Sequence, residues 1–210
     1  MMNSRNYQSE LDGIIKGLAA PPTLLLHGCC APCSSYVLEY LSQHFSITLY
    51  FYNPNITLQE EYTRRLEEVR RLVSVLPVNH PVTLLEGAYD PALFAALAQG
   101  KESEREGGAR CADCYDLRLA QTAQLAAQGG FDYFTTTLSI SPYKNAHKLN
   151  EIGERLAGTY GVRHLPCDFK KRGGYKRSVE LSARYGLYRQ SYCGCVYSKD
   201  AAGHASPSDA

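Results

Sequence analysis

The sequence lacks tryptophan and has no long apolar run. No segment of its 210 residues reaches the roughly 18–20 consecutive apolar residues that a transmembrane helix needs. Residues 1–18 also lack the uninterrupted apolar stretch of a secretory signal peptide. These absences argue against membrane insertion and secretion, and we expect a cytoplasmic protein.

The net charge is also small. The chain carries 22 Lys and Arg against 21 Asp and Glu, a net charge of +1, so it has no general basic field and any nucleic-acid contact must come from a local patch. A hydrophobic content of 44% with 20% charged residues is typical of a globular protein with one well-buried core. We therefore expect a single α/β domain over residues 1–198, with an N-terminal helical extension over 1–20 and a disordered tail over 199–210.

What the chain has in excess is cysteine, with eight residues. In a reducing compartment, clustered cysteines bind metal or carry out redox chemistry more often than they form disulfides. Seven of them form three groups along the chain: Cys29, Cys30 and Cys33; Cys111 and Cys114; Cys193 and Cys195. One structural zinc ion or one cubane iron–sulfur cluster needs four ligands. The surplus favours a cluster together with a second metal or a redox thiol pair, whereas the isolated Cys167 is predicted to be a small buried residue.

Short apolar runs alternate with segments of helical periodicity. We expect strands at 23–27, 47–52, 82–85, 131–137 and 162–165. We expect helices at 7–18, 32–45, 57–76, from 90 onward, at 111–127, 145–156 and 174–185. Thr57 and Glu60 have the spacing of a capping box. The alternation predicts a parallel sheet with helices on both faces, in which ligands bind beyond the carboxyl ends of the strands.

A basic stretch over residues 163–177 contains six Lys or Arg against one acid, Asp168. Phe169 and Tyr175 interleave with these charges, and the Gly173-Gly174 pair predicts a flexible middle. Such a loop suits a phosphate backbone with unstacked bases. A solvated surface loop is an equally good interpretation.

Six motifs resemble one family, the cobalamin-independent epoxyqueuosine reductases, over about residues 22–198. They are LLLHGCCAPCS at 24–34, FYNPNI at 51–56, GARCADCYDLRL at 108–119, TTLSISPYKN at 136–145, DFKKRGGY at 168–175 and YRQSYCGCVYS at 188–198. The resemblance implies a three-layer α/β fold similar to the nucleotide α-hydrolase-like (HUP) fold. It also implies reduction of epoxyqueuosine to queuosine in tRNA, the last step of queuosine biosynthesis.

The resemblance implies a 4Fe–4S cluster, with room for an additional iron ion, held by the seven grouped cysteines. It implies two partners, the tRNA anticodon loop that carries epoxyqueuosine and an unidentified electron donor. The candidates for proton delivery are Asp168, Tyr143 and Tyr188, and the candidates for tRNA contact are Lys144, Lys170, Lys171, Arg172, Tyr175 and Arg189. Two other functions remain open from the residues alone: a thiol–disulfide or sulfur-transfer enzyme that uses Cys30 and Cys33, and a nucleic-acid-binding module with structural metal.

Overall fold

The computed structural model describes residues 5–199, which are built around a five-stranded parallel sheet. The strands are β1 (Thr23–Gly28), β2 (Ser46–Phe51), β3 (Val82–Glu86), β4 (Tyr133–Thr136) and β5 (Arg163–His164), in the order β3-β2-β1-β4-β5. Every pair of neighbouring strands is parallel, in the register Leu24 to Ile47 and Leu24 to Tyr133 across the central strand. The predicted α/β fold with a parallel sheet is confirmed.

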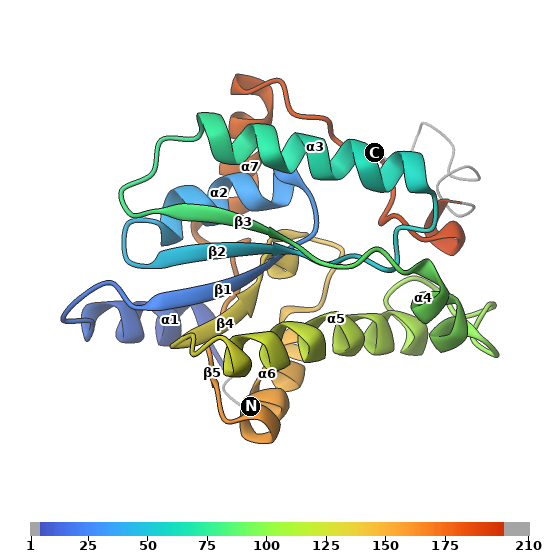
Figure 1. Cartoon of the computed structure of the whole chain (residues 1–210), viewed down its shortest axis with the longest axis horizontal. Coiled ribbons are helices and arrows are strands. Elements are labelled where there is room, and N and C mark those ends of the chain that lie inside the picture. The colour runs from blue at the N-terminus through green and yellow to red at the C-terminus, as the bar shows by residue number, and fades with distance from the viewer. Residues whose placement is uncertain (1–4, 200–210) are drawn as a thin grey trace.

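Helices cover both faces of the sheet (Figure 1). They are α1 (Tyr7–Lys16), α2 (Ala31–Leu41), α3 (Gln59–Val75), α4 (Pro91–Ala98), α5 (Ala109–Gln128), α6 (Ala146–Tyr160) and α7 (Gly174–Arg184). In Figure 1, α2, α3 and α7 lie on one side of the strands, and α5 and α6 lie on the other. None of the helices between residues 5 and 199 combines the length and the apolar composition that a bilayer crossing requires.

The alternation of side chains along the central strand divides the core into two parts. Leu24 and Leu26 of β1 point into a cluster with residues of α1, α2 and α3. Leu25 points to the opposite face, where it packs with Phe134 of β4 and Leu119 of α5. Successive residues of a strand face opposite sides. A strand that is covered on both faces is therefore apolar at consecutive positions, as β1 is.

Two local predictions were wrong. The proposed capping box does not form, because Leu58 occupies the N-cap of α3 without a side-chain cap, and the backbone N–H of Thr57 instead donates to the Gly194 carbonyl. The Gly173-Gly174 pair is not a flexible spacer. Gly173 has a φ of 76° at the start of α7, and a Cβ on Gly174 would overlap the Phe169 carbonyl oxygen.

The predicted C-terminal tail falls outside the described residues from position 200 onward. Lys199, where the tail was expected to begin, still donates its backbone N–H to the Cys195 carbonyl. Residues 1–4 of the predicted N-terminal extension also lie outside the described part of the chain, and α1 accounts for the helix expected there.

Candidate metal centre

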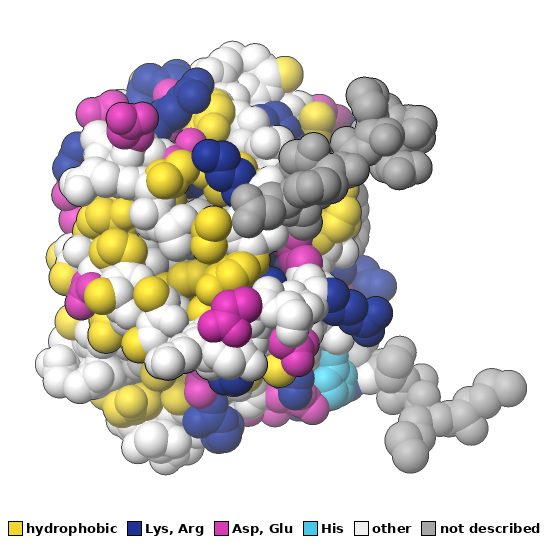
Figure 2. Space-filling model, turned by 90° about the vertical axis from the view of Figure 1, so that its right-hand side faces the viewer, with side chains coloured by type: hydrophobic (Ala, Val, Ile, Leu, Met, Phe, Trp, Pro, Cys, Tyr) yellow, Lys and Arg dark blue, Asp and Glu magenta, His cyan; other side chains and the backbone are white. Residues whose placement is uncertain are grey.

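The first cysteines lie where the strand order reverses. From β1 the chain proceeds outward to β2 and β3, and it then returns to place β4 on the other side of β1. Open α/β sheets bind ligands at such a switch point, beyond the carboxyl ends of the strands. Cys29 directly follows β1, and its backbone N–H donates to Oγ1 of Thr137, which directly follows β4, over 3.4 Å. Figure 2 shows this side of the molecule, where hydrophobic-class side chains, cysteine and tyrosine included, gather between charged ones.

Cys29, Cys30 and Cys33 form a compact three-cysteine group. Cys30 is the N-cap of α2 and Pro32 stands in the first turn, so the turn after β1 folds the three thiols toward each other. Their sulfur atoms all lie within 4.8 Å of one another, and Cys29 Sγ and Cys30 Sγ are 3.7 Å apart. Sulfur ligands about 2.3 Å from one tetrahedral ion stand roughly 3.8 Å apart. The group thus has the dimensions of a site for a single metal ion.

The three thiols share one negative charge. Hydrogen bonds from Cys30 and Cys33 hold the pKa of Cys29 well below its usual range, and the nearby charges of Arg118 and Lys144 lower it further. The same interaction, together with burial, raises the pKa of Cys30 to about 12 and that of Cys33 well above its usual value. Of the three thiols, Cys29 is therefore the one whose ionised form these contacts favour.

A four-cysteine group lies on the loop and helix that face this turn. Cys111, Cys114, Cys193 and Cys195 line one small pocket together with Asn55, Phe94 and Tyr115. Within residues 5–199, no second set of three ligand atoms is as tightly packed as the three-cysteine group, so these four sulfurs stand further apart than ligands of one ion do. A cubane cluster presents its irons at separate corners, and its thiolates are accordingly more widely spaced than those around a single ion.

The C-terminal cysteines are brought to this pocket by α3. Arg65 is 2% exposed, and its Nη1 and Nη2 donate to the carbonyls of Cys193 and Tyr192 at 3.0 and 3.1 Å. Its Nε forms a 2.6 Å ion pair with Glu61. Gly194 has a φ of 119°, which favours glycine, and a Cβ there would lie 2.9 Å from Ile56. These contacts fix the Cys-Gly-Cys turn.

Four residues of α5 present one chemical face. Cys111, Cys114, Tyr115 and Arg118 are spaced i, i+3, i+4 and i+7, so they lie along one side of the helix. Burial raises the pKa of Cys114 to about 12, and it also raises the pKa of Tyr115. Arg118 was not among the predicted site residues, although the sequence shows an arginine on the same side of the helix as the two cysteines.

A polar residue that supports the cysteines was also missed. Gln190 Nε2 donates to Cys30 Sγ over 2.9 Å. Lys144 lies near thiols: burial would lower its pKa, but the charges of Cys193, Tyr115 and Cys29 raise it. Its contact with tRNA stays a prediction. No local sequence pattern marks Gln190, because its partner is 160 positions away.

The three candidate proton donors do not converge on the cysteines. Tyr143 is 80% exposed. Tyr188 donates its hydroxyl to Glu61 over 3.0 Å, and Asp168 forms a 2.8 Å ion pair with Lys170. None of the three is in the three-cysteine group or lines the pocket of the four-cysteine group. Their catalytic role stays a prediction.

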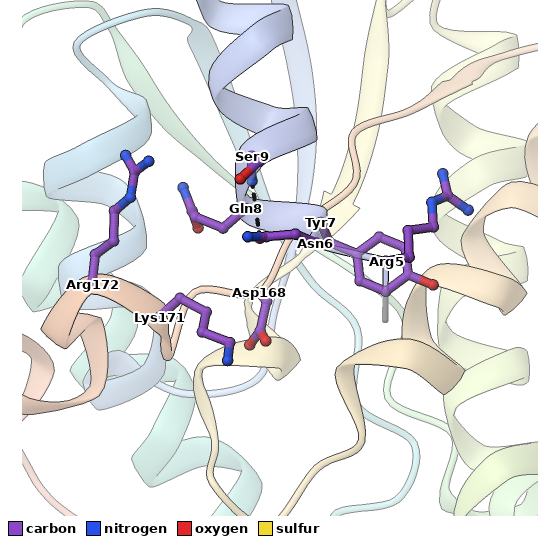
Figure 3. Close-up of a pocket in the computed structure, with 8 residues that line it drawn as sticks. All are labelled: Arg5, Asn6, Tyr7, Gln8, Ser9, Asp168, Lys171 and Arg172. Atoms are coloured by element: carbon purple, nitrogen blue, oxygen red, sulfur yellow. Dashed lines mark hydrogen bonds between the residues drawn. The ribbon is translucent and has the colours of Figure 1, made fainter. Parts of the chain in front are cut away.

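The basic stretch borders a separate cavity of about 280 Å³. Figure 3 shows Asp168, Lys171 and Arg172 around this cavity, opposite residues 5–9 at the start of α1. Arg172 has a φ of 53° and is ion-paired with Asp12, whereas Lys171 forms no ion pair within the described residues. Tyr175 is partly exposed on α7, and Arg189 donates to Ser182. The tRNA-binding roles of these residues stay predictions.

Cys167 is buried, as predicted, and 1% of its surface is exposed. Its Sγ contacts the hydroxyls of Thr135 and Ser139 at 3.3 and 3.2 Å, and Asn150 bonds its backbone on both sides. These contacts anchor the segment after β5 to β4 and α6. Cys167 belongs to neither cysteine group.

Comparison with known proteins identifies the family of the chain. The family model described as epoxyqueuosine reductase QueH matches residues 24–201. Epoxyqueuosine reductase QueH of Streptococcus pyogenes serotype M1 is 48% identical over 178 residues, covering 84% of this chain and 70% of that protein. That of Thermotoga maritima is 36% identical over 183 residues, covering 84% and 90%. NMN synthetase from Francisella tularensis, a solved structure, is 13% identical over 94% of this chain and 90% of that one, with a TM-score of 0.33. The model covers most of the chain, and on that ground the chain belongs to the epoxyqueuosine reductase QueH family.

Proposed function

We propose that this chain reduces epoxyqueuosine to queuosine in tRNA in the cytoplasm, with a 4Fe–4S cluster on the four-cysteine group and a further iron on the three-cysteine group. The observation that carries the proposal is the division of seven thiols into these two groups at the switch point of the sheet. Family membership supports the reaction, and the sulfur chemistry supports the cofactors.

The residues present fit these metals. All eight cysteines are free thiols, and thiolate is the ligand of both iron–sulfur clusters and soft metal ions. Four cysteines satisfy a cubane, whereas three leave one coordination position open for an exchangeable ligand. Three cationic side chains lie close to the thiols and favour their ionised forms: Arg65, Arg118 and Lys144.

The reaction replaces an epoxide with a carbon–carbon double bond, consumes two electrons and two protons, and releases water. The iron sites, when loaded, supply the electrons one at a time and a Lewis acid for the epoxide oxygen. The chain itself must admit an unpaired base, orient it and deliver protons. Tyr143 is exposed and precedes Lys144 in the chain, so it is free to stack on or donate to such a base, and we propose substrate contact there.

The thiol–disulfide alternative is less well supported. A thioredoxin-type mechanism needs a reactive thiolate at one cysteine of the C-x-x-C pair, Cys30 or Cys33. Here the pKa of both is raised, whereas that of Cys29, which lies outside the pair, is lowered.

The test is anaerobic reconstitution with iron and sulfide, followed by incubation with epoxyqueuosine-containing tRNA and a strong reductant. We expect about five irons per chain, a cubane plus one, and loss of one oxygen from the modified nucleoside by mass spectrometry. Cys111→Ser should lose the cluster, and Cys29→Ser should lose the additional iron but keep the cluster. Cluster-replete protein that leaves epoxyqueuosine unchanged would refute the reaction.

Cys167→Ser is the matched control for these substitutions, because it changes a buried cysteine outside both groups. It should retain iron content and turnover. The triple variant Lys170→Ala, Lys171→Ala and Arg172→Ala tests the basic stretch separately: tRNA binding should weaken and its salt dependence flatten while iron content stays at the wild-type level.

A further inference from the structure

One buried cation joins the two cysteine groups by contacts that the function proposed above does not use. Arg118 lies on α5 one helical turn after Cys114 and is the largest fully buried side chain of the described residues, with 1% exposed. Arginine is charged at any physiological pH, so a wholly buried guanidinium requires partners. The partners of Arg118 show what it supports.

Two of its nitrogens hold the turn that carries the three-cysteine group. Nη2 donates to Asn53 Oδ1 over 2.5 Å, and the same amide donates through Nδ2 to the Gly28 carbonyl over 2.9 Å. Nε donates to His27 Nε2 over 3.3 Å. His27 and Gly28 immediately precede Cys29. Arg118 therefore reaches from the helix of Cys114 to the backbone that positions Cys29.

The His27 ring is held by several neighbours. Its Nε2 lies 3.1 Å from the Tyr52 carbonyl oxygen as well as 3.3 Å from Arg118 Nε. Its Nδ1 lies 2.8 Å from Thr136 Oγ1 at the end of β4. The guanidinium is thus tied to both strands of the switch point.

The third nitrogen, Nη1, is buried and has no hydrogen-bond partner among residues 5–199. The groups that its charge acts on are the thiols of Cys114, Cys29 and Cys193, which belong to both cysteine groups. Such an unpaired buried donor calls for an acceptor, and a metal cluster held by these cysteines would supply sulfur atoms.

We propose that Arg118 is a positioning residue shared by both metal sites: its guanidinium fixes the Cys29 turn through Asn53 and His27, keeps Nη1 available as a donor to a bound cluster, and makes the cluster on the four-cysteine group easier to reduce. The inference rests on the proposed function. Hydrogen bonds to sulfur and a nearby positive charge both stabilise the more negative, reduced state of an iron–sulfur cluster. A solely structural arginine would support the turn without changing the reduction equilibrium.

The experiment compares full-length, anaerobically reconstituted wild type with Arg118→Gln, which removes the charge, and Arg118→Lys, which keeps it. Iron and sulfide content, and the midpoint potential from a reductive titration followed by electron paramagnetic resonance, are measured for each. We expect Arg118→Gln to be at least tenfold harder to reduce, which is about 59 mV for a one-electron couple. Arg118→Lys should shift by less than half of that.

Arg155→Gln is the matched control. Arg155 lies on α6, and its exposed guanidinium is paired with Asp116 of α5, the helix that carries Arg118. The substitution is the same as in Arg118→Gln. Its potential should equal that of the wild type. A loaded Arg118→Gln cluster with the wild-type potential would overturn the inference.

If Arg118→Gln takes up no iron, its midpoint potential cannot be measured, and Arg118→Lys then tests the inference. A folded Arg118→Lys apo-protein, checked by circular dichroism, should bind iron at the wild-type stoichiometry, and failure to do so would overturn the role of the charge. A wild type without any iron–sulfur signal would instead defeat the proposed function itself, so the two failures are distinguishable.

Discussion

Arg65→Ala should detach the C-terminal cysteines from the four-cysteine group while leaving the sheet folded. The substitution removes an ion pair with Glu61 and two hydrogen bonds to backbone carbonyls, all made by a side chain that is 2% exposed. Removing one partner of a buried ion pair costs about 3–5 kcal/mol. The lost contacts join α3 to the segment that carries Tyr192 and Cys193. The substitution therefore lowers the free energy that holds this segment against α3.

At about 1.4 kcal/mol per tenfold, this loss increases the undocked population by roughly 10²–10⁴. Hydrogen exchange of the apo-protein should therefore accelerate by that factor at the slowest-exchanging amides of residues 190–199 and stay unchanged in β1 and β4. Iron uptake should fall to what the three-cysteine group holds. Arg64→Ala is the matched control. Arg64 is exposed and lies 3.5 Å over the Tyr188 ring, a contact worth only about 0.5–1 kcal/mol, so its loss should change exchange far less. If Arg65→Ala exchanges within threefold of the wild type and binds full iron, the reasoning fails.

Three further predictions concern glycine and histidine. Gly194→Ala should lower iron content without unfolding the protein, because alanine is strained at a φ of 119° and its Cβ would press on Ile56; metal analysis beside circular dichroism tests this. Gly153→Ala should lower stability by about 1–3 kcal/mol, since its Cβ would overlap the His164 ring; urea denaturation measures the loss. Burial, with the charge of Arg5, lowers the pKa of His164 to about 4, so the folded state keeps the ring neutral while the unfolded chain protonates it near pH 6.5. Stability should therefore decrease by up to roughly 3 kcal/mol as the pH falls from 6.5 to 4, and His164→Asn, followed by urea denaturation at several pH values, should reduce that slope.

Most of the fold was predictable because its signals are local. The run from Thr23 to His27 is apolar at consecutive positions and is flanked by Pro21-Pro22 and Gly28, and β1 has nearly the predicted bounds. Asp90 caps α4 through Ala92 N–H, with Pro91 in its first turn, so this helix begins where it was expected. Thr57 was mispredicted because its N–H bonds to Gly194, a contact made across 137 positions that no local pattern contains.

The site was only partly predictable for the same reason. Spacing along the sequence indicated which cysteines group together, but it could not show that Cys111 and Cys114 share a pocket with Cys193 and Cys195. Charged side chains were assigned to solvent or to tRNA by default, since Lys and Arg are rarely buried. Lys144 also lies near the thiols, which this default did not indicate.

Burial of these cations follows from the charge balance of the cysteine groups. Metal binding requires thiolates, yet burial is the largest of the causes that raise the pKa of Cys114 to about 12, and it also raises the pKa of Cys111. A pocket lined only by apolar groups would hold its thiols protonated and bind iron weakly. Arg118 and Lys144 oppose that effect by favouring the ionised sulfur, and the thiolates in turn offset the cost of burying the cations. Each set of buried charges is therefore stable only in the presence of the other, which explains why side chains from α3, α5 and the segment after β4 converge on one edge of the sheet.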